Sequence, residues 1–332
     1  MLLTIAIPSH NLDVSLVDSA ISSIVSEEAF GIDVNIIISD NSLSNYTKEL
    51  YDLKYKYNEN IYYFDSKDYS SLDENVNRAV ELSDSEYVWI FGDDDIIVPG
   101  ILGHIMDFIR QKSPDLMVLN SKSFKKNKII EDSRVKKNIQ LIYGLNEKDK
   151  FLKNLGGYLT YVACILVKKD LWIENFNQEK IGSFFAHIDC VASIKSKRIA
   201  YYFSSPAIKM RIGSQTWTEK SFEIWNFFYP DLIWGLEGYS DESKESVIKR
   251  QPCNSFLSML SKRAYGSLNI DIWFKIILSS SKVFLTYKIF SLLICLLPRI
   301  GFVFAYKFFI LCFKRNQSLV FSPGLALATL DN

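Results

Sequence analysis

The chain has 332 residues, of which 48% are hydrophobic and 23% charged, a composition typical of a folded protein with a sizeable core. Lysine plus arginine and aspartate plus glutamate number 38 each, so the net charge of zero argues against general nucleic-acid binding. The five cysteines are widely spaced without a CxxC pair, which favours a reducing compartment over a disulfide framework or a zinc knuckle.

The first residues are typical of a buried strand rather than of a secretion signal. Leu2–Ile7 is a short apolar run without a basic region before it, and it ends at Pro8-Ser9-His10-Asn11. We therefore expect the chain to begin with a core strand and to reside in the cytoplasm.

Apolar runs and helical stripes alternate over about the first hundred residues. This alternation predicts an α/β fold with a doubly wound, mostly parallel, Rossmann-like sheet. Further expected strands are Val34–Ile38, Ile61–Phe64, Tyr87–Phe91 and Leu116–Asn120, and expected helices are Val14–Val25, Tyr46–Tyr57, Leu72–Leu82 and Ile101–Arg110.

Three of the expected strands end in polar clusters, at Pro8–Asn11, Ser39–Ser42 and Gly92–Asp95. Ligands of doubly wound sheets bind at the carboxyl ends of the strands. The sequence therefore predicts one crevice that these three clusters share.

The acidic triplet Asp93-Asp94-Asp95 follows a buried strand. Three adjacent carboxylates are costly there unless a positive charge neutralises them, and hard oxygen ligands favour Mg²⁺ or Mn²⁺. Such a cation would stabilise a departing diphosphate. An isolated acidic triplet also fits a solvated turn or a helix cap. The preceding strand and the matching clusters favour the metal.

These motifs resemble those of family 2 glycosyltransferases with the GT-A fold. Thr4–Asn11 is similar to the opening strand of that family, Ile37–Ser42 to its second acidic segment, and Tyr87–Asp95 to the strand that ends in the DxD motif. Asp73-Glu74-Asn75 resembles the D-x-N of an abequosyltransferase-like O-antigen subgroup. The resemblance covers about residues 1–105 and, more loosely, 180–230.

The resemblance assigns the nucleotide-sugar contacts to the strand ends. It implies that Pro8, Ser9 and Asn11 shape the loop around the base and ribose. It further implies that Asp40 hydrogen-bonds the base and that Asn75 fixes the base or ribose from the neighbouring helix.

The resemblance also assigns roles within the acidic triplet. Asp93 and Asp95 resemble the DxD pair that holds the metal, with Asp95 the first choice for direct metal contact and Asp94 a second candidate. Asp93 and Asp94 are also expected to contact the nucleotide sugar. The common family form has an aspartate where this chain has Gly92, so the ribose contact usually assigned to that aspartate lacks its residue here.

Inverting transfer requires a base that takes the proton of the acceptor hydroxyl. Many family members supply it from a Glu-Asp pair, whereas this chain has the segment Gly182–Asp189, similar to the F-x-H of the subgroup. The resemblance implies His187 as the base, with Asp189 either orienting it or acting in its place. A purely structural His187 is the alternative.

The segment Arg211–Trp217 resembles a subgroup loop that ends in a tryptophan. Arg211 there would pair with the diphosphate and Trp217 would stack on a sugar ring. The alternatives are a surface salt bridge for the arginine and core packing for the tryptophan.

The C-terminal region is strongly apolar over Val283–Phe313, but its longest run without charge or proline, Ile289–Leu297, has nine residues and is too short for a simple membrane span. We expect two helices in the membrane interface whose basic residues meet anionic lipids. A helical hairpin packed on the catalytic domain is the alternative.

Three regions are predicted. Residues 1–120 form the nucleotide-sugar-binding half of a GT-A domain, 121–240 its acceptor-binding half, and 241–332 a helical, apolar, membrane-associating C-terminal extension. The basic run Lys122–Lys137 is expected to be a solvated hairpin or mobile loop rather than a nucleic-acid-binding face.

The resemblance to family 2, together with the acidic triplet, implies an inverting, hexosyltransferase-type glycosyltransferase that uses Mg²⁺ or Mn²⁺ and a UDP-, dTDP- or CDP-sugar. The implied acceptor is a hydroxyl of a polyprenyl-diphosphate-linked oligosaccharide in O-antigen-like surface polysaccharide synthesis, at the cytoplasmic face of the inner membrane. A nucleotidyltransferase is one alternative, but Pro8–Asn11 contains no Gly-rich phosphate loop. A non-catalytic, membrane-associated scaffold that keeps the fold is another.

Overall fold

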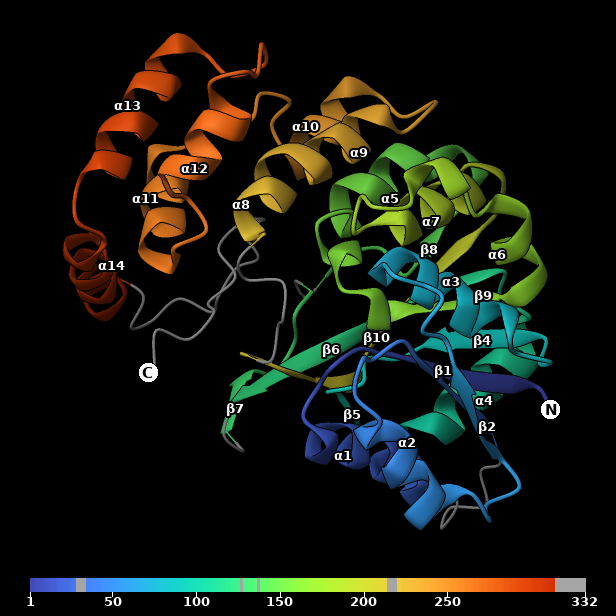
Figure 1. Ribbon diagram of the computed structural model, residues 1–332. Helices are drawn as coiled ribbons and strands as arrows, with labels where there is room; N and C mark the ends of the chain where they lie inside the picture. The colour runs from blue at the N-terminus through green and yellow to red at the C-terminus, as the bar shows by residue number, and fades with distance from the viewer. Residues whose placement is uncertain (28–33, 126–127, 136–137, 214–219, 314–332) are drawn as a thin grey trace. The chain divides into compact units, whose positions relative to one another are not determined.

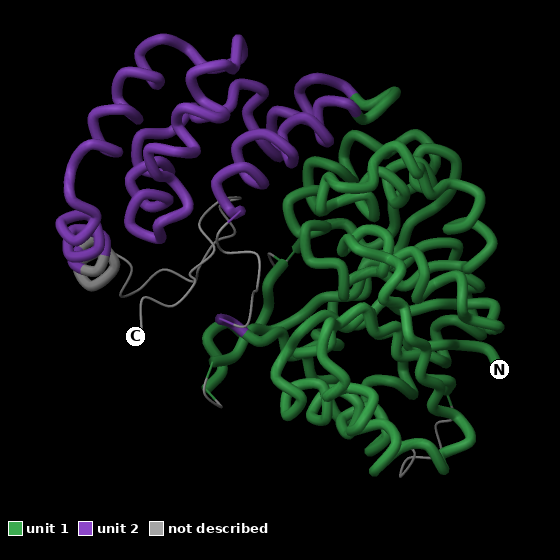
Figure 2. Tube along the Cα trace, viewed as in Figure 1, with its two compact units in different colours: residues 1–211, 236–239 green, residues 212–235, 240–332 purple. Residues whose placement is uncertain are grey.

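The computed structural model describes residues 1–27, 34–125, 128–135, 138–213 and 220–313. The chain divides into two compact units, residues 1–211 with 236–239 and residues 212–235 with 240–332 (Figure 2). Each unit is described by itself.

The first unit is built on a mixed ten-stranded sheet in the order β3-β2-β1-β4-β9-β6-β10-β5, with β7 beside β6 and β8 beside β10 (Figure 1). The strands are β1 Leu3–Ser9, β2 Asn35–Asp40, β3 Ile61–Asp65, β4 Tyr87–Ile90, β5 Ile96–Ile97, β6 Leu116–Lys125, β7 Lys128–Glu131, β8 Ile142–Tyr143, β9 Ile165–Lys168 and β10 Ala200–Arg211.

The four strands β3, β2, β1 and β4 are parallel, as the alternating pattern predicts. Beyond β4 the order changes, because β9 runs antiparallel to both β4 and β6. β10 then pairs in parallel with β6. The parallel part therefore contains the three strands whose polar ends were expected to meet.

Helices connect these strands and cover the sheet. In α1, the Asp13 side chain caps the first turn by accepting a hydrogen bond of 2.9 Å from Ser15 N, and one apolar face is buried. The predicted helix at Tyr46–Tyr57 is α2 followed by the π-helical turn η2. The α-helices of this unit are α1 Val14–Val25, α2 Tyr46–Leu50, α3 Leu72–Glu81, α4 Ile101–Lys112, α5 Lys148–Leu155, α6 Lys169–Asn175 and α7 Ala186–Lys197, and η2 is Tyr51–Tyr55.

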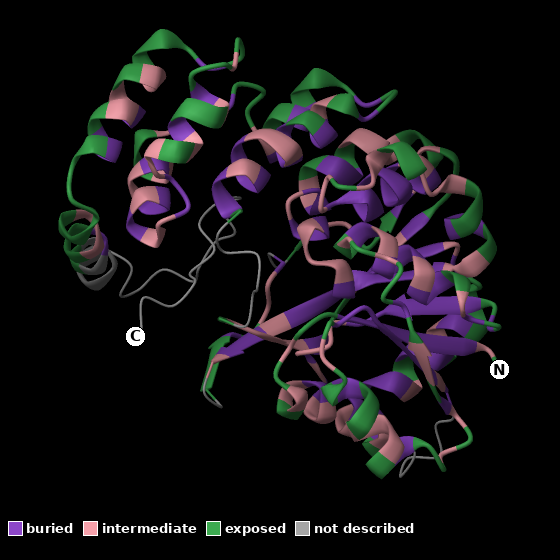
Figure 3. Cartoon of the chain, in the orientation of Figure 1, coloured by how far each residue is buried: buried purple, intermediate pink, exposed green. Residues whose placement is uncertain are grey.

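The core of the first unit lies on both sides of β1 and β4, where the strand colouring in Figure 3 is largely that of buried residues. Trp89 is fully buried on β4, and its indole N–H donates a hydrogen bond of 2.8 Å to Ala163 O. This bond satisfies the polar atom of a large buried ring and ties β4 to the 3-10 turn η5, Val162–Cys164.

The basic run Lys122–Lys137 forms a hairpin over the part that the structure describes. β6 continues to Lys125, and β7 pairs with it antiparallel. Arg134 beyond the hairpin forms an ion pair of 3.2 Å with Glu131, and both side chains are 6% exposed.

The second unit is helical over its described residues and begins at residue 212. Phe222 belongs to this unit, because it packs in one core with Cys253, Met259 and Trp273. The elements are α8 Ser221–Glu223, η7 Ile224–Phe228, α9 Tyr229–Gly235, α10 Asp241–Val247, α11 Phe256–Tyr265, α12 Ile270–Ile272, η8 Trp273–Ile277, α13 Leu285–Leu296 and α14 Arg299–Phe313.

α13 and α14 carry much of the exposed apolar surface of this unit (Figure 3). Among the described residues, no helix by itself has the length and apolarity to cross a membrane. Leu285–Leu296 and Arg299–Tyr306 meet those criteria as a pair, with a bend of 103° between them.

Candidate active site

The polar ends of β1, β2 and β4 lie together, as the sequence predicts. Ser9 pairs with Asp40 in the β1–β2 register, and Phe91 N donates a hydrogen bond of 2.8 Å to Ala6 O at the end of β4. His10 N lies 3.3 Å from Asp93 Oδ2, which joins the end of β1 to the acidic triplet.

The turn after β1 is fixed by hydrogen bonds to the turn after β2. Pro8 and Ser9 are the last residues of β1, and Asn11 adopts a φ of 47°. Asn11 N donates a hydrogen bond of 2.7 Å to Ser42 Oγ, while Asn11 Oδ1 accepts one of 2.9 Å from Leu43 N. The predicted nucleotide loop is thus locked to the neighbouring strand end.

Asp40 is fully buried at the end of β2. Its Oδ1 accepts a hydrogen bond of 3.0 Å from Ser42 N, and its Oδ2 accepts one of 2.9 Å from the Tyr63 hydroxyl. The carboxylate is therefore held in one orientation by its own turn and by β3.

Asn75, on the first turns of α3, connects the two strand ends. Its Nδ2 donates to Ser9 O at 3.1 Å and to Asn41 Oδ1 at 3.2 Å, and its Oδ1 accepts 2.7 Å from Ser39 Oγ. The side chain is 1% exposed, so in this arrangement it organises the strand ends.

His10 and Asn41 complete this cluster, and sequence reasoning gave neither a role. His10 Nδ1 lies 2.9 Å from Asn41 Oδ1. Both residues fall inside the polar clusters that end β1 and β2. Their position in the sequence could therefore have indicated a place in the site, whereas a histidine or an asparagine by itself does not.

Burial and mutual repulsion oppose ionisation of the carboxyl groups in the acidic triplet. Burial, with repulsion from Asp94, raises the pKa of Asp93 to about 7. The same two causes raise the pKa of Asp95 well above its ordinary value, and its side chain is 2% exposed. Two carboxylates that are costly to ionise together favour a bound positive charge.

Asp95 is held from two distant parts of the chain. Tyr161, just after the 3-10 turn η4 (Tyr158–Thr160), donates its hydroxyl at 2.5 Å to Asp95 Oδ2, and Arg211 N donates at 3.2 Å to Asp95 Oδ1. Both contacts lower the pKa of Asp95 against the effect of burial. Tyr161 carried no signal in the sequence, because it belongs to no motif and lies 66 residues away.

Gly92 accommodates the Asp95 carboxylate. A β-carbon at Gly92 would lie 2.4 Å from Asp95 Oδ2 and 3.1 Å from Asp95 Cγ, well inside contact distance. The aspartate that the common family form has at this position would therefore displace Asp95 from its place. The glycine at position 92, where the common family form has an aspartate, is therefore what allows Asp95 to adopt its conformation.

Arg211 lies beside the triplet at the end of β10. Its Nε donates 3.0 Å to Asp94 O, and its guanidinium carbon is 4.8 Å from the centre of the Phe124 ring. The arginine is thus placed next to the predicted diphosphate site. Trp217 lies outside the described residues.

His187 and Asp189 lie on the first turn of α7, and both are buried. His187 Nε2 lies 3.0 Å from Leu159 O, and burial lowers the pKa of the imidazole to about 4. Burial raises the pKa of Asp189, while Lys180 and Asn177 oppose that rise. His187 therefore contacts the short segment that contains Tyr161, whereas Asp189 interacts with Asn177 and Lys180, which precede α7.

The carboxylates of the acidic triplet fit a cation that takes only some of its ligands from the protein. Among the residues that the structure describes, no group of three or more His, Cys, Asp or Glu side chains is arranged as a metal site. Asp93 and Asp95 provide two carboxylates of raised pKa. Mg²⁺ commonly uses one or two carboxylates together with substrate phosphates and water.

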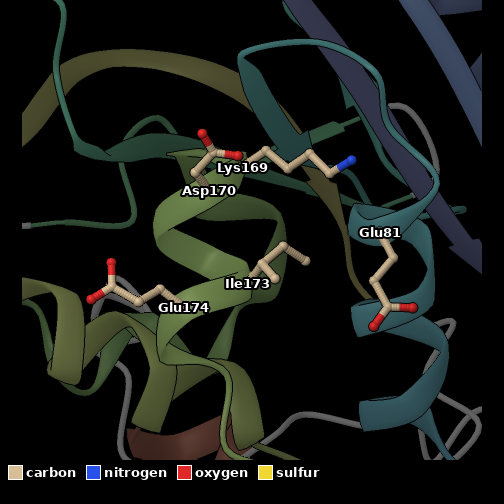
Figure 4. Close-up of a pocket in the computed structure, with 5 residues that line it drawn as sticks. All are labelled: Glu81, Lys169, Asp170, Ile173 and Glu174. Atoms are coloured by element: carbon tan, nitrogen blue, oxygen red, sulfur yellow. The ribbon is translucent and has the colours of Figure 1, made fainter.

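One surface hollow of about 510 Å³ lies apart from these residues. Figure 4 shows its lining, with Glu81 from α3 and Lys169, Asp170, Ile173 and Glu174 from α6. Lys169 Nζ also donates to Ser83 O. None of the residues predicted for donor binding or catalysis lines this hollow.

A doubly wound sheet with polar and acidic residues at the carboxyl ends of its strands is an α/β architecture that binds nucleotides at that edge. The model of the family described as glycosyl transferase family 2 matches residues 4–172, about half of the chain. The chain belongs to glycosyltransferase family 2.

Relatives agree with this family. Abequosyltransferase RfbV of Salmonella typhimurium is 24% identical over 233 residues, which cover 66% of this chain and 69% of the relative. The predicted resemblance to family 2 and to its abequosyltransferase-like members is confirmed.

Solved structures agree with the fold. Staphylococcus aureus TarS superimposes with a TM-score of 0.53 at 14% identity over 83% of this chain and 49% of TarS, so this chain spans about half its length. TarS 1–349 in complex with UDP superimposes with a TM-score of 0.52 at 11% identity, over 92% of this chain and 91% of that TarS chain. The predicted GT-A fold with a helical C-terminal region is confirmed.

Proposed function

We propose that this family 2 enzyme inverts the anomeric carbon of a sugar while moving it from a nucleoside diphosphate to a hydroxyl of a lipid-linked oligosaccharide, in the synthesis of a bacterial surface polysaccharide. The observation that carries the proposal is the acidic triplet at the end of β1, where Asp93 contacts His10 N and the pKa values of the Asp93 and Asp95 carboxyls are raised. The similarity to an abequosyltransferase supports the polysaccharide setting.

The donor binds across the strand ends in this proposal. Pro8, Ser9 and Asn11 form the turn around the base and ribose; Asn75 supports that turn through Ser9 O, and Asp40, which fixes the turn after β2, is the proposed partner of the base. Hydrogen bonds from Asn11 to Ser42 and from Asn75 to Ser9 O support a preformed loop, which reduces the ordering cost of binding. The UDP complex of the structurally similar TarS supports a nucleoside diphosphate.

Mg²⁺ or Mn²⁺ is the proposed cofactor, as is general in this family. Asp95 and Asp93 would hold the cation, with Asp94 and Arg211 beside the diphosphate. A bound cation would supply charge stabilisation for the departing diphosphate. Arg211 adds a fixed positive charge, since its Nε is anchored on Asp94 O at 3.0 Å.

His187 or Asp189 is the proposed base. Burial lowers the pKa of the His187 imidazole to about 4, so the ring is neutral at physiological pH and can accept a proton, but it is a weaker base than an exposed imidazole. Its ring nitrogen Nε2 is bound to Leu159 O, which leaves Nδ1 for the acceptor hydroxyl. Asp189 either assists from the same helical turn or replaces it.

The test is thermal stability with UDP, dTDP and CDP, each with and without Mn²⁺. Ligand at about 100 times its dissociation constant adds roughly 2.7 kcal/mol to the free energy of unfolding. In the wild type we expect one of the three nucleotides to raise the melting temperature in a metal-dependent way. This shift should be lost in Asp95→Asn. Asp107→Asn, an exposed carboxylate on α4, is the matched control. A folded wild type without any shift would favour the non-catalytic scaffold instead.

We further propose that the enzyme is peripheral on the cytoplasmic face of the inner membrane, through α13 and α14. Leu285, Ile289, Leu293 and Leu296 recur at helical spacing on α13, and each is more than 50% exposed. Exposed apolar residues on α14 and in the turn before it extend this surface, which we call the apolar face: Leu297, Ile300, Phe304 and Phe308. A patch of this extent indicates a membrane or partner contact.

The charge of the C-terminal sequence favours a membrane as the partner of the apolar face. The sequence from 272 to 330 contains seven basic residues and no aspartate or glutamate. Apolar side chains among cations of a single sign fit anionic lipid head groups above acyl chains. The same location would bring the enzyme to a polyprenyl-diphosphate-linked acceptor.

Co-sedimentation with vesicles tests this location. We expect binding to phosphatidylcholine vesicles that contain phosphatidylglycerol, weaker binding without it, and roughly tenfold weaker binding for Leu293→Glu, since the substitution places a charge in the interface. Leu53→Glu, at an 86% exposed leucine on η2, is the control for an added charge. Equal binding of the two variants would contradict the role of the apolar face.

A further inference from the structure

Asp73 joins two parts of the first unit that are far apart in sequence. Its Oδ2 accepts hydrogen bonds of 2.9 Å from Gly182 N and 2.9 Å from Phe184 N, and its Oδ1 accepts one of 3.0 Å from Ala186 N. The carboxylate is 3% exposed. Three backbone donors on one buried side chain fix the whole segment 182–186.

This segment is the entry to α7, and it needs an external anchor. Gly182 has a φ of 91° and Phe184 a φ of 67°, the left-handed region that a phenylalanine rarely adopts. The residue that precedes α7, Phe185, makes no side-chain cap. Asp73 provides the missing cap by accepting from the first helical residue, Ala186.

The same turn of α3 also reaches the donor side. Asn75, two residues after Asp73, donates to Ser9 O and Asn41 Oδ1 at the ends of β1 and β2. His187 directly follows the residue that Asp73 caps. One rigid helical turn therefore contacts both the proposed nucleotide loop and the start of the helix that carries the proposed base.

We propose that Asp73 is a positioning residue that sets the location of the His187–Asp189 turn relative to the bound donor. This inference rests on the proposed function, because it takes the base to lie on α7. Asp73 touches no reacting atom; it acts through the backbone of 182–186. Its loss leaves the nucleotide loop in place and lets the base move.

The test compares Asp73→Asn with Glu74→Gln. The two substitutions remove the same charge from adjacent residues, but a glutamine at 74 still caps α3, whereas an amide at 73 turns a donor toward backbone N–H groups. Hydrogen exchange of a peptide over 182–188 should be about tenfold faster in Asp73→Asn and unchanged in Glu74→Gln, because only the first variant opens these bonds.

Kinetics separate positioning from general destabilisation. We expect kcat for release of nucleoside diphosphate from the donor to fall about 10- to 100-fold in Asp73→Asn, while KM for the donor and the metal-dependent nucleotide shift stay within about twofold. Loss of the nucleotide shift together with kcat would make the role structural and overturn the proposal. So would exchange and kcat equal to those of Glu74→Gln.

A second variant covers the case in which Asp73→Asn does not fold. Gly182→Ala meets no atom within 4 Å, yet it strains a backbone that requires positive φ, so it disturbs the same segment without disturbing the core. Faster exchange over 182–188 with lower kcat is expected, and unchanged kcat with faster exchange would overturn the proposal. A wild type without a nucleotide shift would instead reject the proposed function.

Discussion

The Tyr161 hydroxyl lies 2.5 Å from Asp95 Oδ2, across 66 residues of sequence, and two residues before Tyr161 the carbonyl of Leu159 lies 3.0 Å from His187 Nε2. One short segment thus contacts both the proposed metal ligand and the proposed base. The bond from Tyr161 lowers the pKa of Asp95, which burial and Asp94 raise. Tyr161 therefore favours the ionised form that a cation requires.

Tyr161→Phe should weaken metal-dependent nucleotide binding. A hydrogen bond to a charged group contributes about 1.5–3 kcal/mol, and its loss makes Asp95 harder to ionise, so we expect roughly a tenfold or larger loss in apparent Mn²⁺ affinity. Manganese titration in the presence of the nucleotide measures it. Tyr158→Phe is the matched control, because that hydroxyl bonds Leu119 O and Ser121 Oγ instead. Equal affinities in the two variants would contradict the role of Tyr161.

The pKa of Asp93 predicts a pH dependence of stability. Because that pKa is raised from 3.8 to about 7, the folded chain binds more protons than the unfolded chain between these values. The contribution of Asp93 to stability should therefore fall as pH rises from about 4 to about 7. Bound Mg²⁺ with nucleotide should reverse the fall.

Melting temperatures of wild type and Asp93→Asn at pH 5 and pH 8 measure this effect. At pH 8 without metal, the melting temperature of the variant should rise relative to that of the wild type. When Mg²⁺ and nucleotide are present, it should fall relative to that of the wild type. A difference between the two proteins that is independent of pH would show that Asp93 does not titrate in this range.

Gly92→Ala should damage the metal site with little effect on folding. The new β-carbon would lie 2.4 Å from Asp95 Oδ2, so the carboxylate must leave its bonds to Tyr161 and Arg211. We expect a 10- to 100-fold loss of activity, since misplaced catalytic groups cost that much. Gly157→Ala, which meets no atom within 4 Å, is the control. Activity equal to that of Gly157→Ala would refute the packing argument.

His187→Ala and Asp189→Asn distinguish the two proposed bases. We expect the larger loss of kcat, about 100-fold or more, from His187→Ala, with the nucleotide shift retained, because general base catalysis contributes on this scale. His104→Ala, on the exposed side of α4, is the control. A larger loss in Asp189→Asn would assign the base to the carboxylate.

The parallel part of the fold could be predicted from the sequence because its signals are local. Leu3–Ser9, Asn35–Asp40 and Tyr87–Ile90 are short apolar runs that end in polar residues, and α1 matches its apolar stripe at both ends. Such runs can be buried only as inner strands. The strand ends then meet by topology, which explains why the acidic triplet lies at the end of β1.

The rest depends on contacts between distant residues. The antiparallel insertion of β9 and the packing of Phe222 into the second core follow from tertiary packing, and no local pattern encodes them. The support of the site is of the same kind: Tyr161 on Asp95, and Asp73 on the segment 182–186.

By itself, the sequence determined the family, the parallel sheet and the acidic strand end, because apolar periodicity and contiguous motifs are properties of neighbouring residues. Only the tertiary structure decided how the carboxylates are held. Gly92 leaves room for Asp95, Tyr161 donates to it, and Asp73 anchors the start of α7. Those contacts exist only once burial brings chain segments 66 to 113 residues apart within hydrogen-bonding distance.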